Sequence, residues 1–174
     1  MKSLPVASSG VLGNIGKLYR NLVESPQILR SFEIANEKSQ KILDGIKNYM
    51  AYGTDEYDET LGQDYISQDI SGSTSIPGTE VNIQSYSQTA AMHHSLFDNI
   101  KMGIPGGDTP GVIQTVYYDE PYGTWSHYWG QWSATGKITG NETSQFIHLN
   151  WQWDENGNII KDFILVLKLK KNYL

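Results

Sequence analysis

The stretch GTWSHYWGQWSATGK, residues 123–137, holds three of the five tryptophans in this chain of 174 residues. Because successive side chains of a β-strand point to opposite faces of a sheet, its alternate positions form two sets. One set consists of Trp125, His127, Trp129 and Gln131, and the other of Ser126, Tyr128, Gly130 and Trp132. So much aromatic surface with so little charge indicates either core packing with a dimer interface, or the wall of a pocket for an apolar or ring-shaped molecule.

The same period of two continues on both sides of this stretch. It predicts strands at about 112–119, 123–135, 143–154 and 159–169. The connections DEPYG, TGKITGNE and DENG are rich in turn-forming residues, and the last is short enough for a tight hairpin. The C-terminal half is therefore expected to form an antiparallel meander of four strands.

The N-terminal half has helical periodicity instead. Apolar positions predict one helix over about 27–51 and another over 80–101. Between these helices, Gly53 is expected to end the first one, and DYISQDI is expected to form a short strand. A short acidic helix is expected to begin at Thr54 or Asp55 and to end at Leu61-Gly62.

Helices that precede a strand meander are typical of the α+β fold class. The length fits one domain, which we place at 27–174. An extension at 1–26 precedes it, and residues 11–23 of this extension have one apolar helical face.

Composition excludes several classes of function. The formal net charge of −6 gives the chain no electrostatic reason to bind nucleic acid or an anionic membrane. Cysteine is absent, which excludes disulfides, thiol nucleophiles and thiolate metal sites. We find no apolar run long enough to span a membrane and no signal-peptide core in MKSLPVASSG, so a cytoplasmic location is expected.

The order of elements resembles that of the nuclear transport factor 2-like superfamily, and within it that of the SnoaL-like polyketide cyclases and their uncharacterised bacterial relatives. The resemblance covers about 38–169 and rests on three local matches. DYISQDISGSTSIPGTE is similar to the family's run into its last long helix, and WDENGNIIKDF is similar to its closing hairpin. GTW is followed ten residues later by TGK, from Trp125 to Thr135, which repeats the spacing of the family's GTH and TGR.

The resemblance implies a cone-shaped fold, in which a curved antiparallel sheet wraps around N-terminal helices and leaves a pocket at the open end. It implies that the Trp125 face of strand 123–135 points inward to this pocket, and that a homodimer forms through the outer face of the sheet. Relatives of this kind include cyclases, isomerases, dehydratases and non-catalytic binding domains, so the fold alone does not name a reaction.

Departures from the cyclase pattern argue against cyclase activity. The family's acid–base histidine at the third position of GTH is replaced by Trp125. Its catalytic aspartate after TGR is replaced by the run Ile138-Thr139-Gly140. The closing strand, where relatives often keep a carboxylate, is interpreted as Phe163 to Leu167 without one.

His127 is the best candidate for a catalytic residue, because imidazole can transfer protons near neutral pH. Asp69 is the acid expected to pair with it, with Asp64 as the second choice. Tyr65 could donate a hydrogen bond to a developing oxyanion. The residues expected to contact substrate are Trp125, Trp129, Gln131, Tyr65 and His93.

The remaining histidines do not suggest a metal. His93 and His94 in the motif MHHS are adjacent on a helix and point about 100° apart, so one faces the pocket and they do not readily share an ion. His148 is expected on the outer face of the sheet, in polar pairing. We expect neither a metal nor another cofactor.

The sequence thus predicts a protein that binds a small apolar or ring-shaped molecule, either as a cofactor-independent acid–base enzyme of the cyclase, isomerase or dehydratase class, or without catalysis. The alternative is a non-catalytic binding or dimerisation domain whose pocket is filled by its own side chains. A third hypothesis is sugar binding on exposed tryptophans.

Overall fold

The computed structural model describes residues 26–75, 79–104 and 111–167. The chain divides into two units, residues 1–36 and 37–174. The second unit contains the sheet and the candidate site. Of the first unit, the described part is the beginning of helix α2 (Pro26–Met50), up to Asn36.

Helix α2 agrees with the helix predicted over 27–51. It ends just before Gly53, whose φ of 82° is a backbone conformation that glycine adopts without strain. The predicted helical face at 11–23 lies outside the described residues, and the domain boundary after residue 26 stays a prediction.

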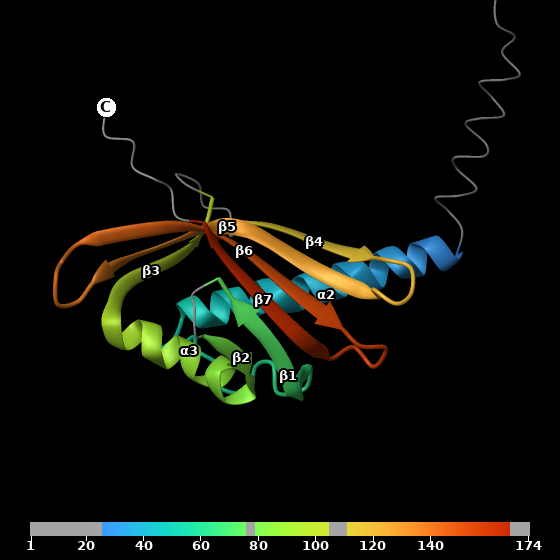
Figure 1. Cartoon of the computed structure of the whole chain (residues 1–174), viewed down its shortest axis with the longest axis horizontal. Coiled ribbons are helices and arrows are strands. Elements are labelled where there is room, and N and C mark those ends of the chain that lie inside the picture. Colours follow the sequence, from blue (N-terminus) through green and yellow to red (C-terminus); the bar gives the residue numbers. More distant parts are fainter. Residues whose placement is uncertain (1–25, 76–78, 105–110, 168–174) are drawn as a thin grey trace, which may run out of the picture. The chain divides into compact units, whose positions relative to one another are not determined.

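The second unit is built on a sheet in which the described strands follow the order β2-β1-β7-β6-β5-β3, and β4 pairs with β5 as well. Figure 1 shows this sheet curving, with β5, β6 and β7 at its centre. The strands are β1 (Ile66–Thr74), β2 (Glu80–Asn82), β3 (Phe97–Gly103), β4 (Val112–Tyr117), β5 (Thr124–Gly136), β6 (Glu142–Trp153) and β7 (Ile159–Leu167).

The predicted four-strand meander is confirmed, because β4, β5, β6 and β7 pair antiparallel in sequence order. The short strand predicted from DYISQDI is also present, as β1. β1 runs parallel to β7, with Gly72 opposite Asp162, so the sheet is mixed rather than purely antiparallel. The α+β fold class is confirmed.

The helix predicted over 80–101 is wrong at both ends. α3 spans Ile83–Leu96, and Asn82 caps it in a reciprocal pair of hydrogen bonds with Ser85, each 2.9 Å long. Phe97 is already extended, at φ −132° and ψ 148°, and begins β3. β3 pairs antiparallel with the second half of β5, and this pairing outweighs the local helical pattern.

The short acidic helix predicted after Gly53 is also wrong, since residues 51–65 form a series of turns. Side chains compete there for the backbone groups that a helix would use. Asn48 Oδ1 accepts a hydrogen bond from the Asp58 N–H at 2.8 Å, and Asp58 Oδ1 accepts one from the Thr60 N–H at 2.8 Å.

The core lies between one face of the sheet and the two helices. Ile42 and Ile46 of α2 pack in the same cluster as Tyr128, Trp151 and other buried residues of the sheet. Within the described residues α2 and α3 both contribute to this cluster, so we call this side the inner face of the sheet and the opposite side its outer face.

The inner face of β5 is therefore the set that contains Ser126 and Tyr128, both with no exposed surface. The expectation that the Trp125 face points inward is wrong. The physical reason is visible at Ser126, whose Oγ accepts a hydrogen bond from Trp153 Nε1 at 2.8 Å and contacts Thr115 Oγ1 at 2.7 Å. Thr115 Oγ1 in turn contacts Ser39 Oγ of α2 at 2.7 Å, so this chain of hydroxyls ties the inner face to the helix.

Candidate functional site

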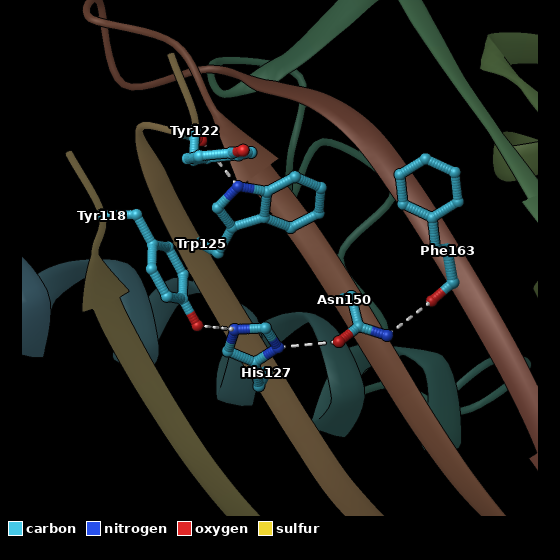
Figure 2. Close-up of a pocket in the computed structure, with 6 residues that line it drawn as sticks. All are labelled: Tyr118, Tyr122, Trp125, His127, Asn150 and Phe163. Carbon is cyan, nitrogen blue, oxygen red and sulfur yellow. Dashed lines mark hydrogen bonds between the residues drawn. The ribbon is translucent and has the colours of Figure 1, made fainter. Parts of the chain in front are cut away.

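A hollow of about 420 Å³ lies on the outer face of the sheet. It is open to one side and its wall is mainly aromatic, as Figure 2 shows. The residues that line it are Tyr118, Tyr122, Trp125, His127, Asn150 and Phe163.

The pairing of three strands brings the floor of the hollow together. His127 of β5 lies opposite Asn150 of β6, and Asn150 lies opposite Phe163 of β7, so the three form one row across the sheet. Trp125 lies two residues before His127 on the same face.

The turn between β4 and β5 supplies the two tyrosines. It is closed by hydrogen bonds from the Tyr118 N–H to the Gly123 carbonyl at 2.9 Å and from the Tyr122 N–H to the Asp119 carbonyl at 3.0 Å. The Tyr122 carbonyl accepts further hydrogen bonds from Trp125 Nε1 at 2.7 Å and Gln152 Nε2 at 3.1 Å, which hold the turn against the sheet.

A chain of hydrogen bonds sets the tautomer of His127 (Figure 2). Asn150 Nδ2 donates to the carbonyl of Phe163 at 3.3 Å, so the other amide atom, Oδ1, is the acceptor that His127 Nδ1 contacts at 2.7 Å. His127 Nδ1 therefore carries the hydrogen, and in the neutral ring Nε2 is the acceptor. The Tyr118 hydroxyl lies 3.4 Å from Nε2 and donates a long hydrogen bond to it.

The rings of the floor are nearly parallel. Trp125 and Phe163 have ring centroids 6.0 Å apart and planes 24° apart, and Trp125 and His127 have centroids 6.5 Å apart and planes 13° apart. The ring of Tyr118 stands at 87° to that of His127. The hollow thus offers ring faces in more than one orientation, and a flat floor on which another ring can stack.

Of the residues predicted to contact substrate, Trp125 lines the hollow, together with the predicted catalytic residue His127. Trp129 and Gln131 follow on the same outer face of β5, beyond the hollow. Trp129 stacks on His148 of β6, with ring centroids 4.7 Å apart, which fits the predicted outer-face position of His148.

Tyr65 and His93 do not belong to this group, because both pack on the inner side. The Tyr65 hydroxyl donates to the Lys41 carbonyl at 3.3 Å, and its ring lies within the core cluster. His93 Nδ1 lies 2.6 Å from the Tyr49 hydroxyl, which also accepts a hydrogen bond from Trp132 Nε1 at 2.9 Å. Burial lowers the pKa of His93, and the neighbouring His94 adds to this effect.

The structure does not bring Asp69 to His127. Asp69 is an exposed residue of β1, and β7 and β6 both lie between β1 and β5. Three strand spacings separate the two residues by about 14 Å, which is far beyond hydrogen-bond distance. The group that orients His127 is Asn150, which the sequence did not identify as its partner.

The interpretation of the closing strand also needs correction, because β7 does carry a carboxylate. Asp162 lies on the inner face opposite Trp151, and it is only 3% exposed. Burial raises the pKa of its carboxyl to about 7, and the nearby indole of Trp151 opposes this rise in part. Among the described residues, Asp162 Oδ1 and Trp151 Nε1 are buried and neither forms a hydrogen bond.

Over residues 26–75, 79–104 and 111–167, no three His, Asp or Glu side chains gather in a way that could hold a metal ion. Over the same residues, no helix is long and apolar enough to cross a membrane.

Comparison of the sequence with protein-family models and with curated proteins gives no match. Comparison of the structure with solved structures gives many. An NTF2-like protein of unknown function from Exiguobacterium sp. 255-15 is 16% identical, with a TM-score of 0.51, and the match covers 71% of this chain and 95% of that one. A proposed SnoaL-like polyketide cyclase from Jannaschia sp. CCS1 is 9% identical, with a TM-score of 0.55 and coverage of 82% and 89%.

A protein with a ketosteroid isomerase-like fold from Catenulispora acidiphila DSM 44928, solved with trimethylamine, is 11% identical, with a TM-score of 0.46 and coverage of 68% and 82%. These identities show the fold alone. The resemblance found in the sequence is confirmed at that level: the chain has the nuclear transport factor 2-like fold, which it shares with SnoaL-like proteins.

Proposed function

Starting from a nuclear transport factor 2-like fold, we propose that this chain binds a small, mainly apolar, ring-bearing molecule in the hollow on its outer face. The observation that carries the proposal is the aromatic floor of Trp125 and Phe163 beside a histidine whose orientation is fixed by Asn150. Such a combination of stacking surface and few placed polar groups is typical of small-molecule sites.

The chemistry open to His127 follows from its tautomer. Among the described residues its Nε2 lone pair is engaged by the long contact from Tyr118, so a ligand hydroxyl could replace that contact and donate to Nε2. Acid–base catalysis by His127 remains a prediction, and it would depend on Asn150 rather than on Asp69. The predicted cytoplasmic location also remains a prediction.

The binding proposal is tested with a panel of small mono- and bicyclic compounds in saturation-transfer NMR. We expect at least one to bind, and Trp125→Ala to weaken it at least about tenfold, because stacking on the indole face is lost. Phe146→Ala is the control, since Phe146 of β6 lies opposite Gln131 on the same outer face but outside the hollow.

Circular dichroism would establish that both variants keep the fold. A panel without any binder would contradict the proposal. So would a ligand whose affinity is the same in Trp125→Ala and in the wild-type chain.

A second candidate function, homodimerisation through the outer face, is favoured by the next row of the sheet. This row crosses four paired strands and consists of Val112 of β4, Trp129 of β5, His148 of β6 and Leu165 of β7. Val112 is 51% exposed, Trp129 40% and Leu165 44%, which is unusual for large apolar side chains that lie together. We propose that a second copy of the chain covers this row.

Trp129→Glu is expected to shift the wild-type dimer to a monomer in sedimentation velocity, because it places a charge in the centre of the apolar row. Ile138→Glu is the control, since Ile138 is 95% exposed and lies in the turn between β5 and β6. A wild-type chain that is monomeric at about 100 μM would rule out this interface. A Trp129→Glu variant that stays dimeric would show that the dimer forms through another surface.

A further inference from the structure

We propose that the hollow binds a quaternary ammonium group, the trimethylammonium head of a choline-like molecule. The inference rests on the proposed function in that it uses the same hollow, and it makes a cationic head group, rather than a neutral ring, the part of the ligand that the hollow holds. It is carried by three observations: the arrangement of the rings, the pairing of the polar atoms, and the charges of the turn between β4 and β5.

The rings of the hollow form a box with a floor and walls. In Figure 2 the rings of Trp125 and Phe163 are seen face-on, whereas the ring of Tyr122 is seen edge-on. Tyr118 adds a further ring at 87° to the imidazole of His127. The face of an aromatic ring is its negative side, so rings in several orientations around one space attract a cation placed among them.

The nitrogen atoms of the box and the amide oxygen of Asn150 already have hydrogen-bond partners. Trp125 Nε1 donates to the Tyr122 carbonyl, both nitrogens of His127 have partners, and both amide atoms of Asn150 are engaged. A ligand that needs several hydrogen bonds would have to break these pairs and leave their partners unsatisfied. A quaternary ammonium carries no N–H and needs none, so it gains from the ring faces without disturbing the pairs.

The sign of the charge follows from the turn that carries the two tyrosines. Asp119 and Glu120 lie between Tyr118 and Tyr122 in the sequence and are both exposed. Within the described residues neither forms an ion pair, so their charges remain available to attract a cation approaching the hollow. Lys161 is the opposing charge, since it lies on the outer face in the same row as Gln152 and Trp125.

The experiment compares choline with 3,3-dimethylbutan-1-ol, which has the same shape and a carbon in place of the charged nitrogen. Isothermal titration or tryptophan fluorescence of the full chain at about pH 8 and low salt gives the two dissociation constants. We expect choline to bind about tenfold more tightly than the alcohol, which corresponds to the strength of cation–π contacts at a partly desolvated site.

The outcomes separate this inference from the proposed function. Equal binding of the two probes, or tighter binding of the alcohol, overturns the quaternary ammonium but leaves an apolar binding site. Binding of neither choline nor any compound of the ring panel overturns both. Binding of ring compounds without choline overturns the inference alone.

Variants test whether the ring faces are responsible. Phe163→Leu keeps an apolar side chain but removes a π face, and it is expected to weaken choline several-fold while changing the alcohol little. Phe146→Leu makes the same change outside the hollow, since Phe146 of β6 lies opposite Gln131 on the same outer face, and it is expected to leave both constants unchanged. Lys161→Gln is expected to tighten choline, because it removes the opposing charge. Choline binding that Phe163→Leu leaves intact would contradict the inference.

Discussion

Replacing Asp162 by Asn is expected to raise the free energy of unfolding at pH 8 by a few kcal/mol. Asp162 is buried opposite Trp151, and Oδ1 has no hydrogen-bond partner among the described residues. Over residues 26–75, 79–104 and 111–167, no ion pair compensates an ionised carboxylate in this position, whereas an amide of the same shape has no charge to bury.

The pH dependence follows from the same residue. Burial raises the pKa of Asp162 from 3.8 to about 7, so between these values the folded chain holds a proton that the unfolded chain has released. Stability therefore falls as the pH rises through this window, by up to about 1.4 kcal/mol per pH unit. At pH values above the folded-state pKa, burial of the ionised carboxylate lowers the free energy of unfolding by its full amount, on the order of 4 kcal/mol.

Urea unfolding at pH 5 and pH 8 measures both effects. The wild-type chain is expected to be less stable at pH 8 than at pH 5, and Asp162→Asn is expected to remove most of this difference. Asp69→Asn serves as control, because an exposed aspartate is expected to change stability by less than about 0.5 kcal/mol. An Asp162→Asn variant with the wild-type pH dependence would show that another group controls it.

Gly72→Ala is expected to cost at least about 3 kcal/mol, or to prevent folding altogether. Gly72 of β1 lies opposite Asp162 of β7. A Cβ at Gly72 would overlap the carbonyl oxygen of Asp162 and lie 2.7 Å from its carbonyl carbon and 3.1 Å from its nitrogen. These are backbone atoms of a central strand, so they cannot turn away as a flexible side chain would.

The control for this variant is Ser73→Ala, one residue later, where a Cβ is already present and the side chain is exposed. The overlap is with the backbone of Asp162, so changing the side chain of Asp162 does not relieve it. The double variant Gly72→Ala/Asp162→Asn is therefore expected to change the free energy of unfolding by the sum of the two single effects. A Gly72→Ala chain within about 1 kcal/mol of the wild type would mean that β1 can move away from β7 at little cost.

The sequence was a good guide to the C-terminal half because its pattern is local. Alternation fixes each strand, and short turns fix antiparallel pairing between neighbours, so β4 to β7 follow from the residues alone. The start of β3 was missed because Phe97, Ile100 and Met102 fit a helix as well as a strand over so short a run. Pairing with a distant strand, as between Phe97 of β3 and Gly136 of β5, decides between the two.

The sequence also could not show which face of β5 points inward. Alternation gives two faces, and the one with Trp125 and Trp129 is the more aromatic. The buried face is decided instead by contacts that no local pattern contains. The hydroxyl of Ser126 reaches Thr115 and Trp153, and the ring of Tyr128 packs directly over Gly130 and Gly111, where a Cβ would collide with it.

Part of the candidate site was predictable for the same reason. Trp125 and His127 lie on one strand and share a face, so alternation alone joins them. Asn150 and Phe163 join them only through the register of two hairpins, and the pairing of His127 with Asp69 failed because strand order, which the sequence does not show, places β6 and β7 between them.

The parallel pairing of β1 with β7 has a consequence for how the chain is made. Ser71 pairs with Lys161, and the Ser75 hydroxyl accepts a hydrogen bond from the Val166 N–H, 91 residues further along. During synthesis β1 leaves the ribosome long before its partner exists. Pairings between residues so distant in sequence form slowly, so the sheet is expected to close only when the last strand has emerged. β2 can pair with β1 early, but the edge of β1 that faces β7 stays unpaired until then.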